Sequence, residues 1–176
     1  MDFTINTALK DKITQSRGNL NPVKHIQLTL TSARLDISDA NAYGSILLGY
    51  LPDRNFVFLG GEFNLSCVKD GTGILSTEQP KVAVGTAAAS NATLSSTMSD
   101  MINGGSTGGL ELAATLTAAA DAHSHDNASG FTILYIGDGA TTGIYLNSSV
   151  NPTGDGYMLI TGTIDLYFLD TGNTTS

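Results

Sequence analysis

Hydrophobic and polar residues alternate along much of this chain, which is the pattern of a β-strand with one buried face. The first such run places its apolar residues at Ile26, Leu28 and Leu30, and then at Ala33, Leu35 and Ile37. Between the two halves the phase slips by one residue, at Thr31 and Ser32. A β-bulge there keeps both halves facing the core, so we predict one long, bent strand that opens the body of the protein.

Later segments repeat the pattern. Strands are predicted over 44–51, from 56 to 67 with an interruption at Gly60 and Gly61, and over 82–84, 131–136, 144–146 and 158–168. Paired glycines within a strand mark a bulge or a close backbone approach. Gly162 falls on the apolar face of the last strand, where a bend of the sheet or the approach of another chain is expected. A helical turn is predicted within 90–102, and 110–126 shows no clear period.

Residues 1–22 differ from the rest and are interpreted as an N-terminal arm that precedes a body of residues 23–176. Phe3 and Ile5 alternate with polar neighbours, and residues 7–16 are predicted to form a short helix with Leu9 and Ile13 on one face. The sequence Arg-Gly-Asn-Leu-Asn-Pro at 17–22 is typical of a loop. About eight short strands separated by turns then indicate an all-β body, an antiparallel β-sandwich or jelly roll.

Composition supports this fold class. The 176 residues include 22 threonines, 16 serines and 20 glycines, whereas charged residues make up only 14%. A helical bundle requires far more Glu, Lys and Arg. The net charge of -8 excludes a typical nucleic-acid-binding surface, and no apolar run reaches the length of a membrane span. Lys10, Lys12, Arg17 and Lys24 make the first 24 residues slightly basic, which fits either an arm that docks on an acidic neighbour or a solvated tail.

Residue types that carry chemistry are few. His123 and His125, between Asp121 and Asp126, are weak candidates for a divalent-metal site, and an exposed polar loop is the simpler interpretation. Cys67 alternates in phase with Phe63 and Leu65 and is expected to be a buried thiol. Neither a nucleophile elbow nor a phosphate-binding loop occurs. We therefore expect no enzymatic activity and no cofactor.

Three blocks in the second half, taken in order, resemble the small virion structural proteins of tailed bacteriophages. They are Val-Ala-Val-Gly-Thr-Ala-Ala at 82–88 with Leu-Ser at 94–95, Ile-Tyr-Leu-Asn at 144–147, and Ile-Thr-Gly-Thr-Ile-Asp-Leu at 160–166. The resemblance implies a capsid decoration or cement protein, a β-sandwich that oligomerises and binds the outside of the phage head. It implies no catalytic residues.

On this interpretation the partners are the major capsid protein and further copies of the chain, as a homotrimer or homodimer, with no nucleic acid and no membrane. The arm is expected to contact the shell through Phe3, Ile5, Lys10, Lys12, Ile13 and Arg17. The alternative is a fibre or tail head domain that binds carbohydrate or a receptor through Tyr43, Tyr50, Tyr145 and Tyr157. A metal-dependent enzyme built on His123 and His125 is the third hypothesis.

Overall fold

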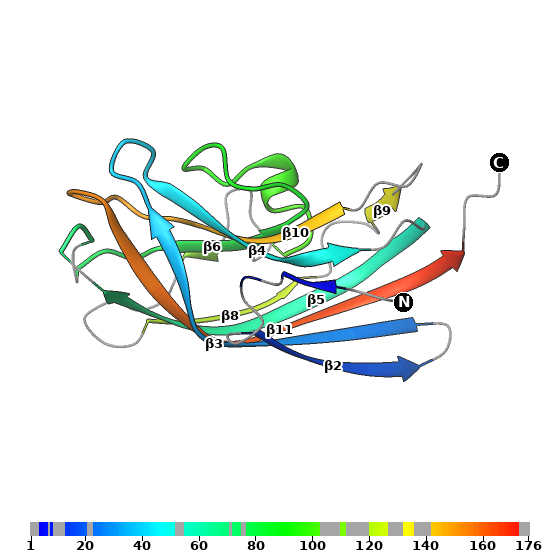
Figure 1. The fold of residues 1–176 in the computed structure, drawn as a ribbon. Helices are drawn as coiled ribbons and strands as arrows, with labels where there is room; N and C mark the ends of the chain where they lie inside the picture. Colours follow the sequence, from blue (N-terminus) through cyan, green and yellow to red (C-terminus); the bar gives the residue numbers. More distant parts are fainter. Residues whose placement is uncertain are drawn as a thin grey trace.

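The computed structural model describes residues 4–6, 8, 13–20, 23–51, 55–70, 72–74, 77–102, 110–111, 120–126, 132–135 and 142–172. These residues form two antiparallel sheets stacked one over the other (Figure 1). The predicted all-β sandwich is therefore confirmed, and no α-helix occurs in the described ranges. The finer expectation of a jelly-roll connectivity stays a prediction.

Sheet A has the order β1-β4-β10-β6-β7. Its strands are β1 (Thr4–Ile5), β4 (Tyr43–Leu51), β10 (Thr142–Ser149), β6 (Lys81–Gly85) and β7 (Leu110–Glu111). Sheet B has the order β2-β3-β11-β5-β8, and β9 also pairs with β5. Its strands are β2 (Ile13–Leu20), β3 (Val23–Ile37), β11 (Gly156–Gly172), β5 (Asn55–Asp70), β8 (Ala120–Asp126) and β9 (Thr132–Tyr135).

The core lies between the sheets and is built from the alternating apolar residues that the sequence predicts. Leu28, Leu35 and Cys67 are fully buried, as are Ile160 and Ile164. Around Phe168 the packing is aromatic, because the Phe56 and Phe58 rings lie 5.9 and 5.4 Å from its ring. Such tilted contacts are favoured over face-to-face stacking.

The predicted irregularities lie where the sequence placed them. Ala33 pairs with Ile160 and Leu30 with Gly162, so two residues of β3 oppose the single Thr161 of β11. Ser32 sits in this bulge with a φ of 49°, and its N–H donates to the Thr161 hydroxyl. A second register shift in β5 falls at Gly60, whose φ is 143°. Both bulges let long strands bend while their apolar faces stay in the core.

The N-terminal segment differs from its predicted structure. The predicted helix over 7–16 is wrong for residues 13–16, and the predicted loop over 17–22 is wrong for residues 17–20. Both stretches belong to β2, which pairs with β3 from Ile13 opposite Leu30 to Leu20 opposite Val23. Backbone pairing with a long neighbouring strand outweighs the weak helical spacing of two apolar residues.

The segment 86–102 loops over sheet A (Figure 1), where Asn147 of β10 binds it, and its last residue, Ile102, pairs with Val84 of β6. The predicted helical turn occurs there as a single 3-10 turn, η2 (Ser96–Met98). Leu94, Met98 and Ile102 are buried. The region 110–126, which had no clear period, contributes the strands β7 and β8.

Candidate functional site

The predicted arm residues are divided between the two sheets. Ile5 lies in β1 opposite Gly49 of β4, whereas Ile13 and Arg17 lie in β2 opposite Leu30 and Ile26 of β3. Phe3, Lys10 and Lys12 lie outside the described residues. In the described strand orders β1 and β2 are each paired on one side only. The N-terminal segment therefore provides an edge strand to both sheets.

His123 and His125 are adjacent in register to polar residues of β5. The backbone of β8 pairs His123 with Asn64 and His125 with Glu62. Within the described part of the chain, no group of three or more His, Cys, Asp or Glu residues could hold a metal ion. The metal hypothesis for these two histidines stays a prediction.

A polar cluster that the sequence did not reveal lies on the outer face of sheet B. The Nε2 atom of His25 is 2.6 Å from Oδ1 of Asp165, and the Gln27 amide donates to the same oxygen at 2.9 Å. The His25 ring stacks on Tyr167 with 4.6 Å between centroids. Burial, followed by the charges of Asp165 and Glu62, raises the pKa of Tyr167.

This His–Asp pair has the first two members of a nucleophile triad but not the third. Among the described residues no hydroxyl or thiol is hydrogen-bonded to the His25 ring, and the ring face is covered by Tyr167. A triad requires a nucleophile within hydrogen-bond reach of the imidazole. The cluster therefore joins β3 to β11, and among the described residues it has no nucleophile that would complete a triad.

On sheet A, a second buried polar group holds the segment 86–102 in place. Asn147 is fully buried, and its amide donates to the carbonyls of Ala87 and Met98 at 2.9 and 2.7 Å. Its oxygen accepts from the Ser45 hydroxyl at 2.6 Å and from the Ala89 N–H at 3.0 Å. All the polar atoms of this side chain are thus hydrogen-bonded, as burial requires.

Asp100 links the two ends of the same segment. Its two carboxylate oxygens accept from the Thr86 N–H at 2.9 Å and from the Thr86 hydroxyl at 2.7 Å. Burial raises the pKa of Asp100, and the two bonds from Thr86 oppose that rise. This carboxylate therefore fixes the start and the end of the segment against each other.

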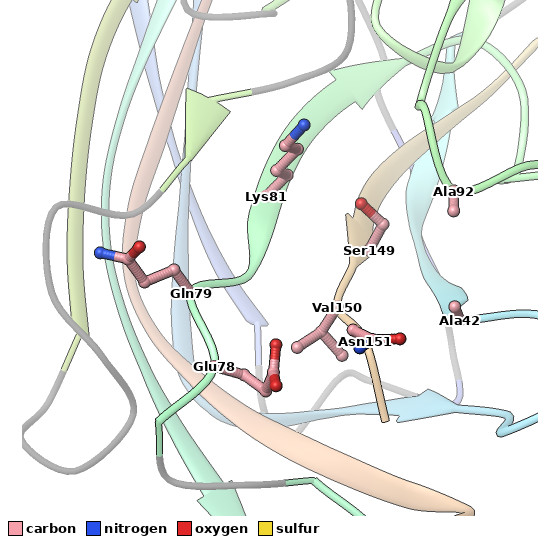
Figure 2. A pocket seen from close by; sticks show the side chains of 8 residues that line it. All are labelled: Ala42, Glu78, Gln79, Lys81, Ala92, Ser149, Val150 and Asn151. Atoms are coloured by element: carbon pink, nitrogen blue, oxygen red, sulfur yellow. The ribbon is translucent and has the colours of Figure 1, made fainter. Parts of the chain in front are cut away.

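A hollow of about 270 Å³ opens where β6 begins and β10 ends (Figure 2). Its polar lining comes from Glu78, Gln79, Lys81, Ser149 and Asn151. Ala42, Ala92 and Val150 supply its apolar lining. The lining thus combines one carboxylate, one ammonium group, two amides and one hydroxyl around a small apolar surface.

A wider hollow lies on sheet B, beside Arg34, Asp36 and Tyr157. Arg34 forms an ion pair with Asp36 at 2.6 Å and lies 3.8 Å from the centre of the Tyr157 ring. The hydrogen bond to Asp70 raises the pKa of Tyr157, and the bond to Asp36 raises that of Arg34. The polar side chains around the Tyr157 ring already satisfy one another.

The four tyrosines of the carbohydrate-binding alternative do not form one platform. Tyr43, Tyr50 and Tyr145 lie in sheet A, whereas Tyr157 lies in sheet B. Tyr43 and Tyr50 are at opposite ends of β4, and only Tyr50 is clearly exposed, at 37%. Stacking of an extended sugar chain across all four rings is therefore excluded by their positions.

No protein-family model matches this sequence, and the curated proteins include none with significant similarity to it. In the described ranges, no helix has the length and apolar character needed to cross a membrane.

Proposed function

We propose that this chain is a non-enzymatic virion structural protein that decorates the outer surface of a phage head and stabilises it. Its partners on this proposal are the major capsid protein and further copies of itself. The observation that carries the proposal is the position of β1 and β2, which give the N-terminal segment an edge strand in each sheet. The resemblance of the second half to virion structural proteins points the same way.

Edge strands matter because their outward N–H and C=O groups can pair with a further strand. Strand addition of this kind supplies backbone hydrogen bonds to a partner without a deep pocket. β2 is eight residues long, long enough for a stable additional strand. It also contains Arg17, one of the basic residues that set the N-terminal segment apart from the acidic body.

The composition suits a lattice of repeated contacts. Threonine and serine lose less side-chain entropy on association than lysine and glutamate. Each copy on a symmetrical shell can bind weakly, since multiple contacts add avidity. A dense cover of small polar side chains therefore favours assembly over recognition of a single tight ligand.

The test is binding to heads that lack the protein. The purified chain is mixed with such heads, the mixture is sedimented, and the copies bound per head are counted. We expect saturable binding at a fixed stoichiometry. Absence of binding under all salt conditions would refute the proposal.

The role of the N-terminal segment is tested by charge reversal rather than by deletion, because loss of β2 would expose the edge of β3. Lys10→Glu with Lys12→Glu should weaken loading by about tenfold, or about 1.4 kcal/mol. The matched control reverses the same two charges at Lys69 and Lys81, in β5 and β6. If both variants load equally, the N-terminal segment is not part of the interface. The proposal that the chain binds heads would then still stand.

A further inference from the structure

We propose that the hollow around Ser149 is a binding site for a single neutral sugar unit, such as the terminal hexose of a glycan. This inference does not depend on head binding and adds a ligand to the chain. It begins from Ser149 itself, which is 5% exposed and lines the hollow. Among the described residues its hydroxyl has no hydrogen-bond partner, in contrast to the neighbouring Ser148, which donates to the Lys81 carbonyl at 2.8 Å.

An unpartnered buried hydroxyl is unusual, because buried polar groups are nearly always satisfied by protein or by bound molecules. In this chain the rule holds at Asn147, whose amide oxygen and nitrogen are both hydrogen-bonded, and at Oδ1 of Asp165, which lies within hydrogen-bonding distance of His25 and Gln27. Ser149 departs from this rule, and its side chain lines the hollow. A group that enters the hollow could satisfy it.

The charges around the hollow select a neutral ligand. Glu78 supplies one negative charge and Lys81 one positive charge, so the residues that line the hollow carry no net charge. Gln79 and Asn151 each offer a donor and an acceptor. Hydroxyl groups are themselves donors and acceptors, and a ring that carries several of them matches this mixed set.

Size and shape select a small ring. A hollow of about 270 Å³ lies just below the range of about 300–1,000 Å³ that is typical of pockets for drug-sized ligands. Val150, Ala42 and Ala92 give it an apolar patch, which suits the C–H face of a hexose. Figure 2 shows that these residues come from three places in the chain: the residue after β10, the β3–β4 turn and the 86–102 segment.

An extended peptide fits this place poorly. The strands beside the hollow, β4, β10 and β6, are consecutive neighbours inside sheet A. Their edges are already paired with each other through Tyr43, Ser149 and Lys81. Strand addition between these strands would therefore have to break an existing pairing.

Hydrogen bonds within the chain fix the residues around the hollow without a ligand. The Ser148 hydroxyl ties β10 to the Lys81 carbonyl, and the Val150 N–H donates to the Ala42 carbonyl at 3.0 Å. Across the hollow, the Asn91 side chain accepts from the Thr93 N–H at 3.1 Å and fixes the turn that carries Ala92. A site with fixed walls loses less entropy when a ligand binds.

The experiment is an NMR titration of the isotope-labelled full chain with the methyl glycosides of glucose, galactose, mannose and N-acetylglucosamine. We expect at least one of them to shift the amides of Ala92, Val150 and Asn151 saturably, with a Kd of about 1 mM. Methyl glucuronide and glucosamine serve as the anionic and cationic probes, and both should bind more weakly than the neutral sugar.

Two variants test the residues. Ser149→Ala should weaken binding at least tenfold, while the matched Ser66→Ala on β5 of sheet B should leave it unchanged. Ala92→Leu fills the hollow from an exposed position and should abolish binding without removing a polar group. The proposal is overturned if none of the four neutral sugars shifts these amides, or if Ser149→Ala binds as well as the wild type. If a single ordered water binds Ser149 and no sugar shifts the amides, the hollow holds water only and the proposal is overturned.

Discussion

A β-carbon placed on Gly162 would lie 2.0 Å from the carbonyl oxygen of Asn64 on the neighbouring strand. Gly162 also has a φ of +139°, which residues with a side chain rarely adopt. Position 162 therefore combines a steric restriction with a backbone restriction, at the point where β11 passes the bulge in β3.

Gly162→Ala should accordingly destabilise the fold by about 3 kcal/mol or more, since strain and collision add. The measurement is the free energy of unfolding in urea. Gly154→Ala is the matched control, because a β-carbon there would meet its nearest atom, the Cα of Gly73, at an ordinary 3.7 Å. Equal stability of the two variants would contradict the role assigned to Gly162.

Removal of the Asn147 side chain should release the segment 86–102 from sheet A. Asn147→Ala leaves the Ala87 and Met98 carbonyls without the amide that now satisfies them. We expect a loss of about 2–4 kcal/mol of unfolding free energy, together with faster hydrogen exchange of the Ala89 amide. Asn64→Ala, at an exposed position of β5, should change stability by less than about 0.5 kcal/mol. A slow Ala89 amide in Asn147→Ala would show that other contacts hold the segment.

The raised pKa of Asp100 predicts that its contribution to the stability of the fold falls as the pH rises. Because burial raises its pKa above the value of 3.8 in an unfolded chain, the folded state binds the proton more tightly. The stabilisation from this group is complete below pH 3.8 and is lost as the pH rises through the raised pKa. In Asp100→Asn the uncharged amide can accept from the Thr86 N–H through its oxygen and donate to the Thr86 hydroxyl through its nitrogen, so its stability at pH 7 should equal or exceed that of the wild type.

The Asp100 prediction is checked by urea unfolding at several pH values from 4 to 7. The difference in unfolding free energy between Asp100→Asn and the wild type should grow with pH. Asn41→Ala, which changes no titratable group at the same exposed turn, provides the control and should show no such growth. A difference that shrinks as the pH rises would reverse the assigned direction of the pKa shift.

The pair of His25 and Asp165 can be separated from the ring stack beside it. His25→Phe keeps an aromatic ring on Tyr167 but removes the 2.6 Å bond to the Asp165 carboxylate. We expect a loss of about 1.5–3 kcal/mol, as for hydrogen bonds to charged groups. In a double-mutant cycle, Asp165→Asn should suppress most of this loss. Full additivity of the two substitutions would mean that the pair contributes through packing alone.

Local sequence was sufficient for the strands that carry a continuous period of two. The alternation from Ile26 to Ile37 predicted both the strand and its bulge, because the phase slip is visible in the sequence itself. The same reasoning placed Cys67 in the core. It failed for 13–20, where Gln15, Arg17 and Asn19 alternate with other polar residues and only pairing with β3 makes the segment a strand.

The polar sites were beyond sequence reasoning for a different reason. His25 and Asp165 are 140 positions apart, and the hollow draws on Glu78, Lys81 and Ser149 from separate parts of the chain. Nothing local distinguishes Ser149 from the other serines or Asn147 from the other asparagines. The position of each depends on strand register, which is fixed by the packing of the two sheets.

The sequence by itself determined the fold class, the apolar faces and the bends of this protein, because period and glycine placement act over a few residues. The tertiary structure alone decided that the N-terminal segment forms edges of both sheets, that Asn147 holds a loop on sheet A, and that Ser149 faces a hollow. These properties arise from contacts between distant segments. Each polar group that becomes buried requires a hydrogen-bond partner. The local sequence does not show which polar groups become buried.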